Sequence, residues 1–237
     1  MSDNGKVPTR PSSQTEVDAF LRRVAEVAPP SAPGERGRLL FALDATASRQ
    51  PTWDRASRLQ GEMFRATADL GGLEMQLAFY RGFGEFRASP WLRDSGQLLR
   101  MMTSTFCLAG ETQIGKVLRH AINQTKERKV NALVFVGDAV EENVDRLGAL
   151  AGELGLLGVP AFMFQEGADP LVEFAFRQVA KLTNGAYCRF DAASADTLRE
   201  LLKAVAVYAA GGRKALAHYA EQQGGESRLL IGQMKGA

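Results

Sequence analysis

The chain has 237 residues, of which 45% are hydrophobic and 24% are charged, an ordinary composition for a soluble globular protein and a length that suits one large domain with tails. Its 29 basic and 27 acidic residues leave a net charge of +2, which argues against nucleic acid as the main partner. Glycine and proline interrupt the longest apolar stretches and the first residues are polar, so we expect no membrane insertion and no secretory signal peptide.

Two segments precede the main domain. Residues 1–13 contain almost no apolar side chains, so we expect a disordered tail. In residues 14–36, a helix start at Ser13-Gln14-Thr15-Glu16 is followed by apolar residues at helical spacing. Three prolines between residues 29 and 33 then end this segment, which is predicted to be an N-terminal helix with a proline-rich linker.

Residues 37–210 are predicted to form one α/β domain, because segments typical of strands and of helices alternate along them. Strands are expected over 38–43, 73–80, 83–88, 131–137, 159–164 and 185–190. Helices are expected over 51–70, 94–104, 112–125, 143–157, 170–183 and 195–210. Arg81-Gly82 joins the second and third strands, which should form an antiparallel hairpin. This order predicts a doubly wound, mostly parallel sheet with one antiparallel edge strand.

The segment after the last predicted helix begins with Gly211-Gly212, which indicates a helix end or a hinge. A second helical stretch follows over Arg213–Glu221, and the sequence from Gly224 onward is mostly polar. Residues 211–237 are therefore predicted to be a C-terminal helical extension and a tail.

The sequence contains two cysteines, Cys107 and Cys188, which could in principle pair with each other. Their spacing is not typical of a disulfide framework or of a zinc site. Thiols are kept reduced in the cytoplasm, where disulfides are rare. We therefore expect two reduced thiols in a cytoplasmic protein.

Side chains with oxygen donors follow the predicted central strands. Asp44, Thr46 and Ser48 alternate after the first strand, Thr112 opens a helix, and Asp138 directly follows the fourth strand. The loops beyond the carboxyl ends of central strands form the ligand crevice of an open α/β sheet, so the five side chains should meet at one rim. All five are hard oxygen donors, which suits Mg²⁺ or Mn²⁺. Taken alone, however, the first loop is also typical of a capped turn.

Other polar residues on the same rim allow two interpretations each. Glu141 and Glu142 could tune ligand choice by repulsion, but acids in the first turn of a helix usually complement the helix dipole. Gln165 and Glu166 could touch a partner or could belong to a solvated loop. The sequence leaves the second pair open and favours the dipole for the first.

The five donors together resemble the metal-ion-dependent adhesion site (MIDAS) of von Willebrand factor A (VWA) domains. The matching residues are Asp44-x-Thr46-x-Ser48, Thr112 within Gly110-Glu111-Thr112, and Asp138. The resemblance, to bacterial-type intracellular members of the family, covers residues 38–210 and includes the order of the elements. It implies a Rossmann-like three-layer sandwich. Gly137 and Ala139 depart from the pattern, because Thr and Gly are common beside the last aspartate.

The resemblance also implies a function. In the family, the hydroxyls approach the metal and the two aspartates act largely through water. Neutral hydroxyls and water-separated carboxylates leave much of the cation's charge uncompensated, so the metal attracts one more anionic oxygen. The implied function is a non-catalytic, metal-dependent protein-interaction module, in which bound Mg²⁺ or Mn²⁺ engages an Asp or Glu of a partner protein.

Two other functions are conceivable for such a sequence. The first is a Mg²⁺-dependent phosphohydrolase on a similar sheet, with Asp44 as the nucleophile. The common aspartyl-phosphate mechanism needs a second acid two positions later, where this chain has Thr46, and neither His120 nor His218 can be placed beside a nucleophile. The second is a scaffold with a vestigial metal site, against which the five intact donors argue. We therefore expect no catalytic residues.

Overall fold

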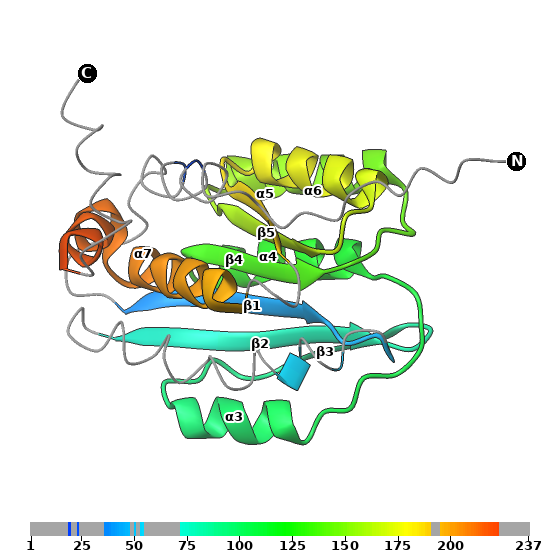
Figure 1. Cartoon of the computed structure of the whole chain (residues 1–237), viewed down its shortest axis with the longest axis horizontal. Coiled ribbons are helices and arrows are strands. Elements are labelled where there is room, and N and C mark those ends of the chain that lie inside the picture. Colours follow the sequence, from blue (N-terminus) through cyan, green and yellow to red (C-terminus); the bar gives the residue numbers. More distant parts are fainter. Residues whose placement is uncertain are drawn as a thin grey trace, which may run out of the picture.

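The computed structural model describes residues 36–47, 72–190 and 195–222, together with residues 19, 23, 50, 53 and 54. The described residues form a six-stranded sheet with the order β3-β2-β1-β4-β5-β6. The strands are β1 Gly37–Asp44, β2 Leu73–Arg81, β3 Glu85–Ala88, β4 Ala132–Gly137, β5 Ala161–Glu166 and β6 Ala186–Phe190. Neighbouring strands are parallel except β2 and β3, which form an antiparallel hairpin at one edge (Figure 1). The predicted fold class is confirmed.

Helices cover both faces of the sheet. They are α3 Ser95–Thr103, α4 Ile114–Glu127, α5 Val144–Leu156, α6 Pro170–Leu182 and α7 Ala195–Gln222. One hydrophobic core lies between the sheet and α4, α5 and α6, and a second lies between the sheet and α3 and α7. Figure 1 shows α7 in front of the central strands, with the other layer behind them. The architecture is therefore a three-layer α/β sandwich.

The central strand β1 is buried along its whole length. Leu39 and Phe41 contribute to the core under α3 and α7, whereas Leu40 and Ala42 contribute to the core under α4, α5 and α6. A strand that is covered on both faces needs apolar side chains at every position, which explains the continuous apolar run in the sequence. The same reason explains β4, in which all six residues are buried.

The C-terminal helix differs from its prediction. We expected it to end at residue 210, but α7 continues through Gly211-Gly212 to Gln222. Glycine in a helix interior costs about 1 kcal/mol relative to alanine. Beyond the glycines, Ala215 and Tyr219 pack against the core, and this burial offsets that cost.

Other expectations can be followed only in part. The tail predicted over 1–13, most of the helix and linker at 14–36, and most of the helix at 51–70 lie outside the described residues. Cys107 and Cys188 are present as thiols. Among the described helices, none combines the length and the apolar character that a membrane crossing requires.

Candidate metal-binding site

The carboxyl ends of β1 and β4 lie side by side at one rim of the sheet. From β1 the chain builds outward through β2 and β3, and it then returns to β4 on the other side of β1. Such a reversal sends the loops after two adjacent strands to opposite faces, which opens a crevice between them. Asp44 is the last residue of β1 and Asp138 directly follows β4, so the fold places both aspartates at the reversal.

The loop after β1 begins with a turn built on Asp44. This residue is 2% exposed, and its Oδ1 accepts a hydrogen bond from the Thr46 amide at 2.8 Å. Ala45 is held on two sides, because its amide donates to the Tyr80 carbonyl and its carbonyl accepts from the Leu108 amide, each at 3.0 Å. The capped turn, which the sequence allowed as the alternative interpretation of this loop, is therefore present, and it fixes Asp44 and Thr46 relative to β2. Of the predicted site residues, Ser48 is outside the described ranges.

Thr112 connects the second loop of the rim to the third. Its hydroxyl accepts a hydrogen bond from the Glu141 amide at 2.9 Å, and its amide donates to the Glu141 carboxylate at 2.7 Å. Thr112 is only 6% exposed, whereas Glu141 is exposed, so this reciprocal pair joins a buried residue to the surface of the rim. Because Glu141 lies three residues after Asp138, the pair brings the Thr112 hydroxyl to the same loop as the second aspartate.

The N-terminus of α4 is capped by the same loop. Gln113, at the cap position, makes no capping bond with its side chain, and the first turn of α4 contains no acid. Instead, the Glu142 carboxylate accepts hydrogen bonds from the amides of Ile114 at 2.5 Å and Gly115 at 2.8 Å. A carboxylate at this position satisfies free amide groups and complements the helix dipole. Glu142 thus serves a helix dipole, as the sequence favoured, but that of α4 and not of the following α5.

Two opposing effects act on the pKa of Glu142. Burial raises the pKa of Glu142 above its usual range, while the amides of Gly115 and Ile114 and the Thr112 hydroxyl act in the opposite direction. Sequence reasoning did not identify Glu142 as part of this arrangement. The available signal was the missing cap and the missing acid in the first turn of α4.

Gly137 accounts for one departure from the MIDAS pattern. A Cβ atom built on Gly137 would lie 2.8 Å from the Phe135 ring and 3.6 Å from the Asp44 Cβ. The first distance is too short for a side chain, so Phe135 occupies the space that a threonine would need at this position. The second distance shows that β4 passes directly beside the Asp44 side chain, and it places the following Asp138 close to Asp44.

Tyr80 lies under the rim and was not predicted to belong to it. It is opposite Asp44 in the register of β1 and β2, and it is completely buried. Burial raises the pKa of Tyr80 well above its usual range, and the negative charges of Asp44, Glu142 and Asp138 raise it further. Carboxylates from two loops therefore raise the pKa of one buried hydroxyl. Only the strand register reveals this neighbour.

The donor set fits a hard divalent cation. Among the described residues, no three side chains of His, Cys, Asp or Glu lie together as a metal-binding group, so carboxylates alone would not complete a site. Asp44 and Asp138 supply two, and the hydroxyls of Thr46 and Thr112 are the further oxygens that the fold brings to the same loops. Oxygen ligands without Cys or His suit Mg²⁺ or Mn²⁺. That a metal binds these residues stays a prediction.

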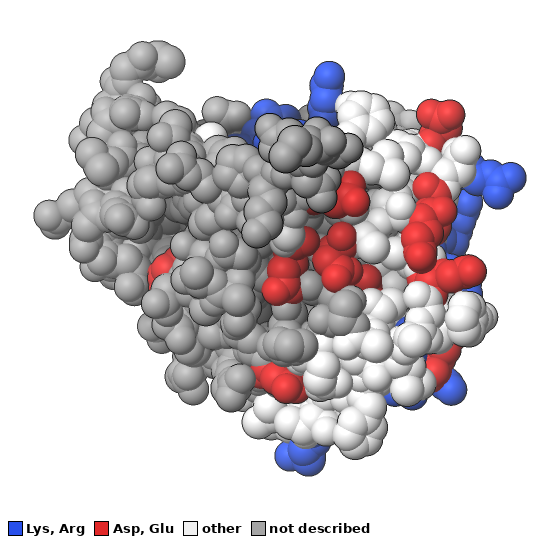
Figure 2. All heavy atoms as spheres, turned by 45° about the vertical axis from the view of Figure 1, so that its right-hand side comes forward, with Lys and Arg blue, Asp and Glu red and all other residues white. Residues whose placement is uncertain are grey.

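The surface at this end of the molecule is acidic. Figure 2 shows several Asp and Glu side chains together near the middle of this face, with Lys and Arg mostly toward its margin. A group of like charges raises the local affinity for cations. The overall charge of +2 gave no indication of this segregation.

No protein-family model matches the sequence, and no curated protein does either. Several solved structures, however, resemble this chain in fold. The SpRpn10 VWA domain has a TM-score of 0.58 at 14% identity, with 71% of this chain and 94% of that chain covered. The pilus adhesin SpaC from Lactobacillus rhamnosus GG has a TM-score of 0.57 at 10% identity, with coverage of 81% and 31%.

A third structure is described with a metal. Proximal thread matrix protein 1 from the mussel byssus, with a zinc-occupied MIDAS motif, has a TM-score of 0.53 at 13% identity, with 72% of this chain and 48% of that chain covered. The present chain thus spans less than half of the mussel protein and about a third of SpaC. Identities this low show the fold alone. The sheet order, the two helical layers and these likenesses together give the conclusion that this protein has the fold of VWA domains.

Proposed function

We propose that this protein is a non-catalytic binding module that holds one divalent cation, Mg²⁺ or Mn²⁺, and uses it to engage an Asp or Glu of a partner protein. The proposed ligands are Asp44, Thr46, Ser48, Thr112 and Asp138. The proposal places the protein in the cytoplasm, where Cys107 and Cys188 stay reduced. It excludes nucleic acid and membrane insertion as modes of action.

The observation that carries the proposal is the joining of three loops at the strand reversal. Asp44 ends β1, Asp138 follows β4, and Thr112 is tied to the loop of Asp138 by its two hydrogen bonds with Glu141. None of these loops needs to meet the others for the sheet itself to form. Their convergence on oxygen side chains therefore supports a common ligand.

The charge of the proposed ligands explains the choice of partner. Two aspartates and neutral hydroxyls would satisfy a divalent cation in number of charges, but water-separated carboxylates neutralise it weakly. An incoming carboxylate then gains a strong contact with the metal, whereas without the metal it meets an acidic face (Figure 2). This predicts that binding of a partner carboxylate at this rim depends strictly on the metal.

Metal titration tests the proposal directly. Calorimetry with Mg²⁺, and Mn²⁺ titration followed by electron paramagnetic resonance, should each show one site in the unaltered protein and no site in Asp44→Ala. Glu153→Ala is the control, because it removes a carboxylate that pairs with Lys126 on the helical surface. Unchanged binding in Asp44→Ala would reject the assignment.

The same Mn²⁺ complex reports on the proposed partner chemistry. Water bound to Mn²⁺ relaxes bulk water protons, and a carboxylate that takes a metal position displaces that water. Addition of glutamate should therefore lower the relaxation enhancement, and glutamine should leave it unchanged. Equal effects of the two probes would mean that the metal does not select a carboxylate.

We propose further that the protein has no phosphohydrolase activity. Asp44 is 2% exposed and its Oδ1 is engaged by the Thr46 amide, which is a poor arrangement for a nucleophile that must reach a phosphoester. Incubation with p-nitrophenyl phosphate and Mg²⁺ should give no turnover. Turnover that Asp44→Asn abolishes would favour the enzyme.

A further inference from the structure

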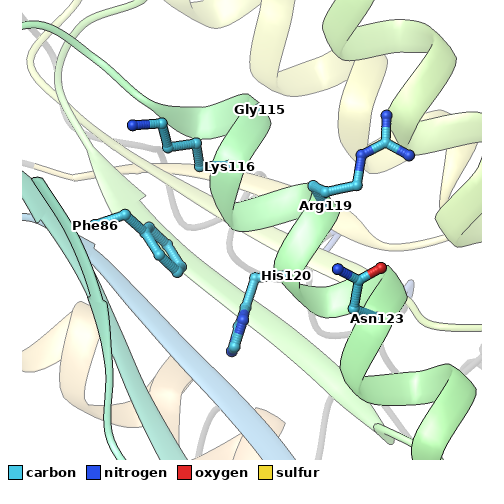
Figure 3. A pocket seen from close by; sticks show the side chains of 6 residues that line it. All are labelled: Phe86, Gly115, Lys116, Arg119, His120 and Asn123. Carbon is cyan, nitrogen blue, oxygen red and sulfur yellow. The ribbon is translucent and has the colours of Figure 1, made fainter. Parts of the chain in front are cut away.

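A hollow of about 440 Å³ lies between the edge strand β3 and helix α4. Phe86 of β3 forms one side of it (Figure 3). The other side is one face of α4, which lines the hollow with Gly115, Lys116, Arg119, His120 and Asn123. None of these residues belongs to the proposed metal site.

The hollow contains a fixed positive charge. The Lys116 ammonium donates to the Gly84 carbonyl and to the Gln113 Oε1, both at 2.8 Å. Both acceptors are neutral, so they hold the ammonium in place without neutralising it. Arg119 adds a second cation, whose contact with Glu153 is 3.4 Å long, and Glu153 is shared with Lys126 at 2.9 Å. This part of the surface therefore carries an excess of positive charge.

The base of the hollow is aromatic and weakly polar. The rings of Phe86 and His120 lie with centroids 5.3 Å apart. His120 Nε2 contacts the Gln76 Oε1 at 2.8 Å, and burial lowers the pKa of His120 below its usual range. The imidazole is therefore neutral at neutral pH and adds to the apolar surface. A cation beside aromatic rings suits a carboxylate on a short aliphatic stem.

The strand beside the hollow has an open edge. Among the described residues, β3 pairs with β2 and with no other strand. The Ser89 amide donates to the Leu77 carbonyl at 2.8 Å, which sets the alternation of the hairpin. By that alternation, Phe86 and Ala88 direct their backbone groups away from β2. Two amides and two carbonyls are thus presented at the edge, next to the hollow.

We propose that the edge of β3 and the hollow together bind an extended acidic segment of a partner protein. The segment pairs with β3 as an additional strand, through the outward backbone groups of Phe86 and Ala88. Side chains of a strand alternate between faces, so the residue of the segment beside Phe86 points to the α4 face and into the hollow. An Asp or Glu at that position meets Lys116. This site is independent of the metal.

The strand edge and the hollow have complementary roles in the proposed site. β3 has four residues, too few to bind a peptide strongly through backbone hydrogen bonds alone. Its other face carries Glu85 and Arg87, charges that discourage indiscriminate strand pairing. The carboxylate contact in the hollow then selects which segment is added.

A pair of peptides tests the proposal. The probe is the pentapeptide Thr-Val-Glu-Val-Thr with an acetylated N-terminus and an amidated C-terminus, and its control has Gln in place of Glu. Both are titrated into ¹⁵N-labelled protein in EDTA, followed by NMR. The Glu peptide should bind at least about fivefold more tightly, and its signals should shift at β3 and along residues 116–123 of α4. Equal affinities, or no binding of either peptide at millimolar concentration, would overturn the proposal.

Variants identify the cation and separate this site from the metal site. Lys116→Met should remove the preference for Glu, Lys116→Arg should keep it, and Lys181→Met on α6 is the matched control. Asp44→Ala should bind the Glu peptide as the unaltered protein does, so that failure of the metal proposal leaves this one standing. Shifts confined to the loops of Asp44 and Asp138 would place the peptide at the metal site and would contradict the proposal.

Discussion

Thr112 shows how one side chain can hold two loops in register. Its hydroxyl and amide both bond to Glu141, while the neighbouring Glu142 caps the helix that begins two residues after Thr112. Thr112 therefore cannot shift without disturbing the loop that carries Asp138. We expected from the sequence only an oxygen donor at this position. The structure adds that the donor is buried and held from the opposite loop.

Two substitutions at Thr112 distinguish its role as a metal ligand from its role in stabilising the fold. Thr112→Val keeps the shape but removes the hydroxyl, which leaves the Glu141 amide without its acceptor and lowers the free energy of unfolding by about 1–3 kcal/mol. It should also weaken Mn²⁺ binding by tenfold or more, whereas Thr112→Ser keeps the hydroxyl and should lose less than threefold. Urea unfolding and Mn²⁺ titration measure the two effects. Equal Mn²⁺ affinity in the two variants would show that Thr112 has only a structural role.

Among the elements, the loop at residues 104–112 depends on one close approach. A Cβ atom on Gly110 would lie 2.1 Å from the Gly82 carbonyl oxygen, in the turn between β2 and β3. The Glu111 amide also donates to this carbonyl, at 3.3 Å. The hairpin therefore serves as a support against which the loop is seated, and a glycine is required where the two backbones touch.

Two glycine substitutions test this support. Gly110→Ala must push the loop away from the hairpin, which should lower the free energy of unfolding by about 1–3 kcal/mol and weaken Mn²⁺ binding through Thr112. Gly152→Ala is the control in the interior of α5, where an added Cβ meets nothing within 4 Å. It should stabilise the protein by about 0.5–1 kcal/mol and leave Mn²⁺ binding unchanged. A Gly110→Ala protein with unchanged stability would show that the loop is not seated on the hairpin.

The elements also show what the sequence could reveal. β1 and β4 were predictable because strands buried on both faces are continuously apolar, and the positions of Asp44 and Asp138 followed from where those strands end. The cap of α4 was not predictable in the same way, since its acid, Glu142, lies 27 and 28 residues after the two amides that it accepts from. Nor was Tyr80, because its place beside Asp44 depends on strand register. Local patterns define elements, whereas contacts across loops require the assembled sheet.

At the scale of the molecule, acidic and basic side chains of the described residues gather on different parts of the surface. Acidic side chains gather at the carboxyl end of the sheet (Figure 2), and the cations Lys116 and Arg119 border the hollow beside β3 (Figure 3). Each surface can therefore attract a ligand that the total charge of +2 would not suggest.

The pH dependence of stability should reflect His120. Burial lowers its pKa in the folded state, so the unfolded chain binds a proton more readily once the pH falls below about 6.5. Its contribution to stability is present above that pH and is lost as the pH falls toward the folded-state pKa, at no more than about 1.4 kcal/mol per pH unit. His120→Gln should flatten this dependence in urea unfolding between pH 7 and 5.5. An unchanged slope would assign the effect to other groups.

The capping of α4 by a distant loop has a consequence for how the chain folds. The helix ends at Glu127, but Glu142, the acid at its first turn, comes later in the chain, beyond the whole of β4. A chain that has left the ribosome only as far as β4 carries the complete α4 sequence with its leading amide groups still unsatisfied. Short helices without such partners are marginal in water. We therefore expect lasting order in α4 only once the segment at Glu142 has been synthesised, so that the loop carrying Asp138 also completes the helix before it.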